Sequence, residues 1–304
     1  ETVYGLGADA FNEDGVRKIY EAKGRPSDNP LIVHVHSFPQ IEQIAYVTPV
    51  ARALIDAFMP GALTIVLKKK DVVPDAVTAG LPTVGLRMPS NPVCRAFLRA
   101  CSHPICAPSA NTSTKPSTTT ASHVFSDLDG KIPYILDGGE CEIGLESTIV
   151  DASGDYGECK LLRAGGLPKE EIERVAGKLE TVAHSRVALC PGMKYRHYAP
   201  EADVYYALQS PSMAIRICRK YDEEKAKGRK AVIFCLSGSM ARYDARTVED
   251  MGENCDSYAH RLFACLRRAD EQGYQTVLCE GVPSSGVGEA IANRLIKSSG
   301  GKSI

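Results

Sequence analysis

The chain has 304 residues, of which 44% are hydrophobic, and a formal net charge of −1 at pH 7. This length fits one large domain or two ordinary ones, with enough apolar residues to bury real cores. The near-zero charge argues against wide electrostatic binding to nucleic acid, and no apolar run approaches the roughly 20 residues of a membrane span.

The first part of the chain predicts alternating helices and strands. Asn12 can cap a helix that runs to about Lys23, and Asn91-Pro92 starts another helix with the cap and first-turn proline in their favoured order. Further helices are predicted at 50–58 and 168–176, and strands at 1–8, 31–36, 63–67, 83–87, 105–107, 134–136, 148–151 and 160–163. The run from Thr112 to Ser122 is rich in Ser and Thr, which fits either a flexible linker or an active-site loop.

A change in composition near 178–201 predicts a domain boundary. Residues 190–200 form an aromatic and basic segment bounded by Pro and Gly. We therefore expect a first domain at 1–178, a linker at 179–201 and a second domain at 202–304. The second domain shows strands at 203–208, 230–236 and 276–280 and helices at 212–227, 255–272 and 287–298. This alternation predicts a small parallel sheet covered by helices.

Eleven cysteines are scattered along the chain, without a Cys-x-x-Cys pair and without zinc-site spacing. Apolar surroundings such as Val232-Ile233-Phe234 before Cys235 predict reduced, buried thiols and a cytoplasmic protein. The chain starts at Glu1 without a methionine, inside what reads as a functional segment, so we expect an incomplete N-terminus.

The segment from Lys23 to Leu31 places two cations next to stiff backbone. Lys23 and Arg25 follow a predicted helix end, and Pro26 and Pro30 restrict the chain before it enters a strand. This arrangement can cradle a phosphate. The same pattern is also typical of a solvated helix cap whose charge favours the helix dipole.

Similar polar residues recur at predicted strand ends and loops of the first domain. They are Thr2, Lys23, Arg25, Asn29, His34, Thr83, Arg87, Ser109, Asn111, Ser117, Ser147 and Arg163. Cations and hydroxyls without a nucleophile motif, a carboxylate pair or a Walker loop suit anion binding and stabilisation of phosphoryl charge. Structural alternatives remain: a surface role for Arg87, a core position for His34 and an ordinary turn at 109–111.

Several motifs in sequence order carry a family resemblance. They are Thr2-Val3-Tyr4-Gly5-Leu6-Gly7, Lys23-Gly24-Arg25-Pro26 with Asn29-Pro30-Leu31, Pro60-Gly61-Ala62-Leu63-Thr64, Val84-Gly85-Leu86-Arg87-Met88-Pro89, Pro108-Ser109-Ala110-Asn111 and Glu146-Ser147-Thr148-Ile149-Val150-Asp151. Together they resemble the YrdC-type L-threonylcarbamoyladenylate synthases. The segment from Pro191 to Pro200 with the α/β tail is similar to the linker and second domain of the long, two-domain form.

The resemblance implies both a fold and a reaction. The fold would be an open twisted α/β sheet with a concave basic site, followed by a smaller parallel, Rossmann-like α/β domain. The enzyme, a nucleotidyltransferase, would convert L-threonine, bicarbonate or CO₂, and ATP into threonylcarbamoyl-AMP and pyrophosphate. The product serves modification of the adenosine beside the anticodon of tRNA. Mg²⁺ is the expected cofactor, and proteins of the tRNA threonylcarbamoyl-transfer complex are expected partners.

The resemblance also assigns residues to each substrate. Thr2, His34, Arg87, Ala107 and Ser147 would hold threonine. Arg25, Asn29, Thr83, Ser109, Asn111, Ser117 and Arg163 would hold ATP, together with either Tyr195 or Tyr198 of the linker. Lys23 and Arg25 would be catalytic by offsetting phosphate charge. Because a carbamate is short-lived in water, segment 190–200 is the candidate lid.

The sequence departs from the family pattern at three places. Ser113-Thr114 stands where Ser-Gly is usual, which weakens the assignment of Ser117 because the loop backbone could differ. Ala164 stands where Pro is usual, and Cys190 where Ser often precedes Pro-Gly-Met.

Two other functions compete with synthesis. An RNA-binding module would suit a concave basic face, but the charge balance argues against stable nucleic-acid binding. A carbamoyl-transfer module of the hydrogenase-maturation kind would bring acylphosphatase and zinc-finger elements, which this sequence does not show. The second domain could gate the site, bind a partner or stabilise the first domain, and the sequence does not choose among these roles.

Overall fold

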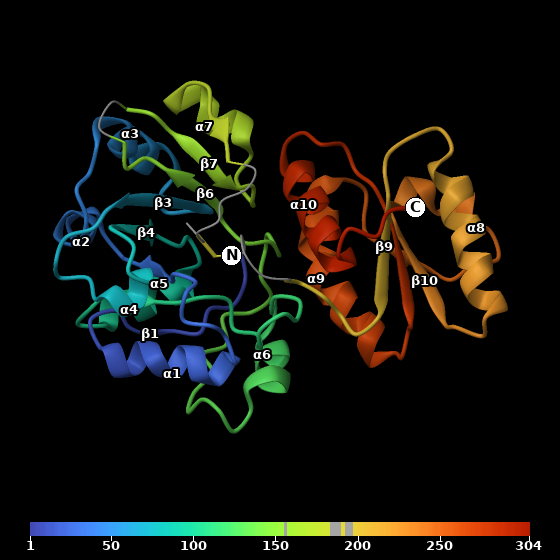
Figure 1. Ribbon diagram of the computed structural model, residues 1–304, viewed down its shortest axis with the longest axis horizontal. Coiled ribbons are helices and arrows are strands. Elements are labelled where there is room, and N and C mark those ends of the chain that lie inside the picture. Colours follow the sequence, from blue (N-terminus) through green and yellow to red (C-terminus); the bar gives the residue numbers. More distant parts are fainter. Residues whose placement is uncertain (155–156, 183–189, 192–196) are drawn as a thin grey trace. The chain divides into compact units, whose positions relative to one another are not determined.

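The computed structural model describes residues 1–154, 157–182, 190–191 and 197–304 (Figure 1). The chain forms two compact units. Unit 1 comprises Glu1–Ser113, Thr118–Glu142 and Glu146–Tyr195, and unit 2 comprises Thr114–Ser117, Ile143–Leu145 and Arg196–Ile304. The main division falls inside the predicted linker segment. Two short segments of the first half belong to unit 2, which the sequence did not indicate.

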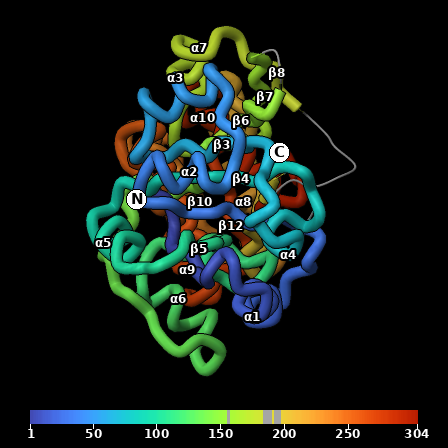
Figure 2. Tube along the Cα trace, turned by 90° about the vertical axis from the view of Figure 1, so that its left-hand side faces the viewer, coloured from blue at the N-terminus to red at the C-terminus, as the bar shows by residue number. Residues whose placement is uncertain are grey.

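Unit 1 is built on a mixed sheet of eight strands in the order β1-β5-β2-β4-β3-β6-β7-β8. The strands are β1 Ala8–Asp9, β2 Ile32–His34, β3 Leu63–Lys68, β4 Thr83–Arg87, β5 Ile105–Cys106, β6 Thr148–Asp151, β7 Lys160–Arg163 and β8 Glu180–Thr181. The helices are α1 Glu13–Lys23, α2 Phe38–Ile44, α3 Pro49–Phe58, α4 Asp75–Thr78, α5 Pro92–Ala100, α6 Ala121–Leu128 and α7 Lys169–Ala176. In both views α1 lies at one end of the unit and α7 at the other (Figure 1 and Figure 2).

Local chemistry explains the helix ends. The Asn12 side chain accepts a hydrogen bond from Gly15 N at 3.1 Å, and Gly24 ends α1 in the left-handed conformation with φ +60°. Asn91 likewise accepts from Cys94 N at 3.0 Å, with Pro92 in the first turn of α5. Both predicted helix starts are confirmed.

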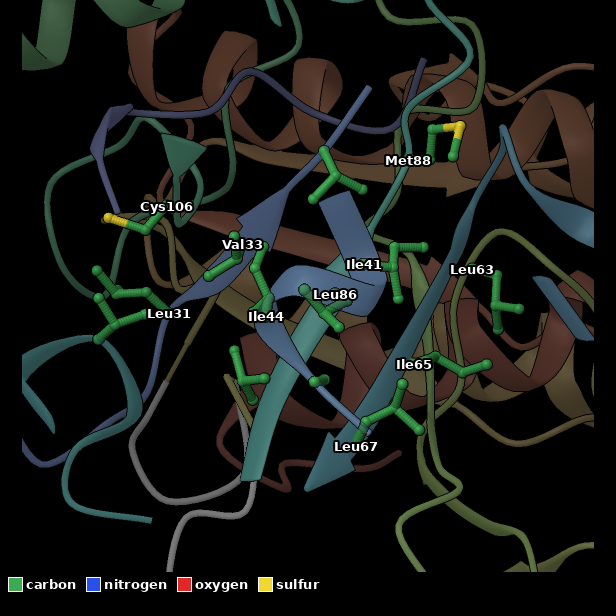
Figure 3. Packing of buried hydrophobic residues seen from close by; sticks show 14 of the residues in the cluster. Leu31, Val33, Ile41, Ile44, Leu63, Ile65, Leu67, Leu86, Met88 and Cys106 are labelled. Atoms are coloured by element: carbon green, nitrogen blue, oxygen red, sulfur yellow. The ribbon is translucent and has the colours of Figure 1, made fainter. Parts of the chain in front are cut away.

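The central strands divide their side chains between two faces of the sheet. Alternate residues such as Val33 of β2, Ile65 of β3 and Leu86 of β4 pack into one buried core, together with Ile41 and Ile44 of α2 (Figure 3). The residues between them point to the opposite face, which we call the site face. On β2, β3, β4 and β6 it comprises Ile32, His34, Thr64, Val66, Thr83, Gly85, Arg87 and Ile149.

Some elements differ from the prediction. The segment 134–136 is not a strand: it has no regular structure, and Tyr134 and Leu136 are exposed. The Ser/Thr-rich run is not an exposed linker, because residues 116–119 are buried and Thr120 caps α6 by accepting from His123 N at 3.2 Å. Helices α2, α4 and α6 were not predicted.

Unit 2 contains a parallel sheet of four strands in the order β11-β10-β12-β9, which confirms the predicted parallel α/β architecture. Its elements are β9 Asp203–Ala207, α8 Met213–Ala226, β10 Ala231–Cys235, a 3₁₀ helix η1 at Ser237–Tyr243, β11 Val248–Asp250, α9 Cys255–Glu271, β12 Thr276–Glu280 and α10 Val287–Ser299. Of the described elements of unit 2, only η1 and the three-residue strand β11 were not predicted.

All eleven cysteines are free thiols, seven of them buried and four half-buried. Among the helices that the structure describes, none has the length and apolar character needed to span a membrane.

Thr114 has a backbone conformation that normally belongs to glycine. Its φ is +78°, and its side chain is exposed, so a β-branched residue is strained there without compensating packing. The backbone thus keeps a left-handed residue where the resembled family has Gly.

We expect Thr114→Gly to raise the free energy of unfolding by about 1 kcal/mol, because relief of strain exceeds the added entropy of the unfolded chain. Urea denaturation would measure the change. Ser113→Gly is the matched control, since Ser113 has no positive φ, and it should lower stability slightly. Equal destabilisation by both substitutions would contradict the strain argument.

Candidate functional site

The N-terminal segment is held against the loop that follows β5. Leu6 N donates to Pro108 O at 2.9 Å and Ala110 N donates to Tyr4 O at 2.7 Å. On the other side, Ala107 N donates to Ile32 O of β2 at 2.8 Å. The sheet pairing therefore brings Ala107 beside the site face, on the strand that also leads to Ser109.

Arg87 is the buried cation at the end of β4. Its Nε donates to Gly61 O at 3.2 Å and one terminal nitrogen donates to Thr2 Oγ1 at 2.7 Å. The other terminal nitrogen forms an ion pair with Glu1. Burial alone would raise the pKa of the Glu1 carboxyl, but the Arg87 charge and hydrogen bonds from Arg87 and the backbone lower it. The surface alternative for Arg87 is therefore wrong.

His34 lies beside Arg87, because β2 and β4 are parallel and the two residues are paired in register. The ring is half-buried, and its Nδ1 lies 3.2 Å from Ile32 O. Burial and the nearby Arg87 charge lower the pKa of His34 to about 4. The imidazole is therefore neutral at physiological pH and offers an uncharged polar group next to a guanidinium.

Ser147 and Arg163 form the second polar centre. Arg163 donates to Ser147 O from Nε at 3.2 Å and from a terminal nitrogen at 2.8 Å, and the Ser147 hydroxyl lies 2.7 Å from Thr64 Oγ1. A Cβ at Gly165 would lie 2.3 Å from Ser147 C, so only glycine allows this close approach of the two segments. Ser147 and Arg163 are consequently fixed to one another at the edge of the site face.

Lys23 holds a loop together. It is buried, and its ammonium donates to the carbonyl oxygens of Ser109 and Asn111. Its own carbonyl accepts from Ser113 N at 2.8 Å. Lys23 thus braces the loop that carries two predicted ATP-binding residues, which is a positioning contact. Its predicted catalytic role stays a prediction.

The loop after α1 contains a buried side-chain amide, that of Asn29. Arg25 donates to the carbonyl oxygens of Asn29 and Pro30, both at 3.1 Å. The Asn29 side chain is fully buried, and neither its amide nitrogen nor its oxygen has a hydrogen-bond partner among the described residues. An unsatisfied buried amide costs about 1–3 kcal/mol per group, so Asn29 is suited to a ligand that restores its hydrogen bonds.

The site face is covered by the start of the linker segment. Cys190 is buried against Ile32, Val66 and Ile149, and Pro191 O accepts from Arg163 at 3.2 Å. The space left beneath Cys190 and Pro191, lined also by Thr64 and Thr83, is only about 10 Å³. Cys190 and Pro191, the first residues of the predicted lid segment, therefore cover this part of the sheet, and Arg163 donates a hydrogen bond to the Pro191 carbonyl there.

A larger cavity of about 740 Å³ lies between α1 and α4. Arg25 lines it, but so do the carboxylates of Glu13, Glu21 and Asp75. These three carboxylates outnumber the two guanidinium groups of the lining, Arg17 and Arg25, and the net negative charge disfavours a phosphate chain. The larger cavity is therefore a poorer nucleotide site than the site face.

The structure brings most of the predicted residues together in unit 1, on the site face or on the loops beside it. Two predicted residues belong to unit 2: Ser117, which is buried, and Tyr198, whose ring is 5% exposed. Tyr195 lies outside the described residues. The sequence missed Glu1, Thr64 and Gly165 as site residues. A polar Thr64 within an otherwise apolar strand was the signal that could have identified it.

Family profiles match almost the whole chain. The Sua5/YciO/YrdC profile, described as "Telomere recombination", matches residues 1–165. The profile described as "Threonylcarbamoyl-AMP synthase, C-terminal domain" matches residues 167–300. The chain belongs to the threonylcarbamoyl-AMP synthase family, in its two-domain form. The predicted resemblance is confirmed.

Curated members of this family align along nearly the full chain. The threonylcarbamoyl-AMP synthase of Pyrococcus abyssi is 47% identical over 99% of this chain and 88% of its own length. That of Bacillus subtilis is 44% identical over 100% of this chain and 89% of its own length.

Solved structures of Pyrococcus abyssi Sua5 are also similar. The complex with L-threonine has a TM-score of 0.94 at 44% identity, covering 100% of this chain and 90% of that one. A variant with an adjacent histidine and tyrosine replaced by alanine has a TM-score of 0.93 at 42% identity, covering 100% of this chain and 88% of that one. In the present sequence His and Tyr are adjacent in that order only at His197-Tyr198.

We expect the lowered pKa of His34 to make the free energy of unfolding depend on pH. Because its pKa is about 4 in the folded chain and near 6.5 when unfolded, the unfolded state binds the extra proton between these values. The free energy of unfolding should therefore fall as pH decreases from about 6.5 to about 4, by roughly 3 kcal/mol from this group.

Urea denaturation across this pH range, compared with His34→Gln, isolates the contribution. The variant should lose less stability on acidification than the parent chain. Parallel pH profiles for both proteins would mean that His34 titrates normally.

Proposed function

We propose that this chain is a nucleotidyltransferase that makes L-threonylcarbamoyl-AMP from L-threonine, bicarbonate or CO₂, and ATP, releasing pyrophosphate. The proposal is carried by the buried Arg87 guanidinium beside the Thr2 hydroxyl and a neutral His34, in a member of the threonylcarbamoyl-AMP synthase family. The product would serve threonylcarbamoylation of tRNA, through proteins of the transfer complex.

The Arg87 end of the site suits an amino acid. Among described residues its guanidinium uses three N–H groups, toward Gly61, Thr2 and Glu1, which leaves two for a substrate carboxylate. A solved Sua5 relative binds L-threonine, which supports this assignment. His34 and Thr2 would then hydrogen-bond the rest of the amino acid.

The chemistry begins with a neutral threonine amine. The amine nitrogen adds to the carbon of CO₂ and loses a proton, giving a carbamate. With a pKa of about 4, His34 is too weak a base to take that proton efficiently near pH 7, so we assign it to binding. One carbamate oxygen then attacks the α-phosphorus of ATP, and the bond to pyrophosphate breaks.

The other end of the site suits a nucleotide. Arg163, Arg25 and the unsatisfied amide of Asn29 supply donors for phosphate oxygens or the base, and the family resemblance adds Thr83 and Ser109. Arg163 would exchange its bond with Pro191 O for a nucleotide oxygen. This exchange supports movement of the segment at Cys190 and Pro191 when ATP binds. The aromatic role predicted for Tyr195 or Tyr198 stays a prediction.

Mg²⁺ fits this site as part of the nucleotide substrate. Guanidinium, hydroxyl and amide groups suit phosphate oxygens, and the described residues contain no group of three or more His, Cys, Asp or Glu placed to hold a metal. The ion would be carried by the phosphate chain and offset the charge on departing pyrophosphate.

Pyrophosphate release tests the proposed reaction directly. Purified protein should release pyrophosphate with ATP, threonine, bicarbonate and Mg²⁺, and release should collapse when threonine or bicarbonate is omitted, because the carbamate is the nucleophile. Release that continues without threonine would contradict the reaction. No release from folded protein under the full conditions would return the RNA-binding alternative to first place.

Arg25→Ala should keep the fold and lower the rate at least a hundredfold, which corresponds to about 2.7 kcal/mol of lost transition-state stabilisation. Steady-state pyrophosphate release would measure the change. Arg17→Ala is the matched control, because Arg17 lies on α1, the helix that ends just before Arg25, is exposed and pairs only with Asp14 and Glu21 among described residues. Near-normal turnover of Arg25→Ala would remove Arg25 from the catalytic machinery.

A further inference from the structure

Thr64 is a polar residue near the start of the buried strand β3. Its neighbours Leu63 and Ile65 pack into the core of unit 1 (Figure 3), so the Thr64 side chain points to the site face. Thr64 is fully buried, and its hydroxyl lies 2.7 Å from Ser147 Oγ. The reaction proposed above gives this hydroxyl no role, although it bonds a residue assigned to threonine.

The sheet register places Thr64 between the two polar centres of the site. Strands β3 and β4 are antiparallel, and the next pair in their register sets Thr64 opposite Arg87. On its other side β3 runs parallel to β6, where Thr64 pairs with Ile149, two residues after Ser147. Thr64 thus has Arg87 on one side and Ser147 on the other.

The hydroxyls of Thr64 and Ser147 carry two protons, and the bond between them uses only one. Either hydroxyl can be the donor in this bond. A terminal nitrogen of Arg163 also donates to Ser147 Oγ, at 3.3 Å. Among the described residues neither hydroxyl has an acceptor other than its partner. One buried proton of the pair therefore lacks an acceptor, which is costly unless a ligand supplies one.

The space around the pair decides which hydroxyl faces a ligand. Thr64 lines the space beneath Cys190 and Pro191, which measures only about 10 Å³. A space of this size holds at most about one water molecule, so a substrate cannot reach Thr64 there. Ser147 lies outside this space, in the loop that leads into β6. Thr64 is therefore the donor to Ser147 Oγ, and Ser147 directs its own proton toward the substrate.

We propose that Thr64 is a positioning residue that fixes the Ser147 hydroxyl as a hydrogen-bond donor to an anionic oxygen of the bound amino acid. That oxygen belongs to the threonine carboxylate or to the carbamate formed from the threonine amine, and both are strong acceptors. A donor that is fixed in advance does not have to reorganise when charge develops on this oxygen. The inference rests on the proposed function and uses residues of unit 1 alone.

Thr64→Val tests the proposal, because it removes the hydroxyl and keeps the β-branched shape. If Ser147 donates to the carboxylate, the Kd of L-threonine, measured by calorimetry without ATP, should rise at least about fivefold, the effect of one typical hydrogen bond. If Ser147 donates to the carbamate, this Kd should stay constant and the kcat of pyrophosphate release should fall by about the same factor. Thr64→Ser retains the hydroxyl and should recover most of either loss.

Thr148→Val is the matched control. Thr148 is equally buried in unit 1, but its hydroxyl bonds Leu167 O at 2.5 Å. The control should lower the melting temperature as Thr64→Val does, and it should leave Kd and kcat unchanged. A double-mutant cycle then shows whether Thr64 acts through Ser147, because Thr64→Val should cause no further loss in a Ser147→Ala background.

Three results would overturn the proposal: an unchanged Kd and kcat in Thr64→Val, an equal loss in Thr148→Val, or a full additional loss in the Ser147→Ala background. If Thr64→Val does not fold, Thr64→Cys replaces it, since a thiol is only a weak donor. Failure of the proposed reaction shows separately, as a parent chain that binds threonine but releases no pyrophosphate. The Kd of threonine alone then decides the role of Thr64.

Discussion

The Arg163 guanidinium donates from two nitrogens to the carbonyl oxygen of Ser147, and this kind of contact recurs through the molecule. Lys23 donates to the carbonyls of Ser109 and Asn111, Arg87 to Gly61, and Arg267 to Pro116 and Ser117. A buried cation is costly to desolvate, and carbonyl oxygens offset that cost while the loop gains a fixed path. In each of these loops the buried cation bonds the main chain rather than a side chain.

The two faces of the sheet in unit 1 also differ in how their side chains are satisfied. Residues at alternate positions of β2, β3 and β4 form the core, so the residues between them must face elsewhere. That second face carries His34, Thr64 and Arg87 among apolar neighbours such as Val66, and it is covered by Cys190. Polar groups on a covered face need partners, and they obtain them from one another and from the loops. At Arg163 a group that binds would exchange an existing hydrogen bond, whereas Arg87 and Asn29 still offer polar atoms without a partner among the described residues.

The sequence predicted what depends on local chemistry. Asn12 and Asn91 mark their helices because a side chain caps nearby backbone, and the parallel sheet of unit 2 follows from plain alternation. Helix α6 was missed because it follows a Ser/Thr-rich run that looks like a loop in the sequence. That run is buried through contacts with residues distant in the sequence, such as the bond from Tyr4 N to Thr118 O. The strand expected at 134–136 is absent: Ile135 packs against the core, but Tyr134 and Leu136 are exposed and the segment joins no sheet.

The site was predictable only in part, for a similar reason. Motif order indicated Arg87, Ser147 and Arg163, but spacing could not show that Lys23 bonds a loop 86 residues away or that Thr64 meets Ser147. Nor could it show that segments 114–117 and 143–145 belong to unit 2. These contacts depend on non-local packing, which leaves no periodic signal in one sequence.

At the three departures from the family pattern, the contacts that the structure shows involve the backbone more than the side chain that differs. Ala164 follows Arg163, whose bonds to Ser147 and Pro191 are intact. Thr114 keeps φ +78° and still presents its carbonyl to Ala199. Cys190 packs against Ile32, Val66 and Ile149 on the site face, and its thiol lies 3.8 Å from the carbonyl oxygen of Pro191. At these positions the side chain differs from the family pattern, while hydrogen bonds to main-chain carbonyls hold the neighbouring loops. The site geometry therefore tolerates a change of residue there.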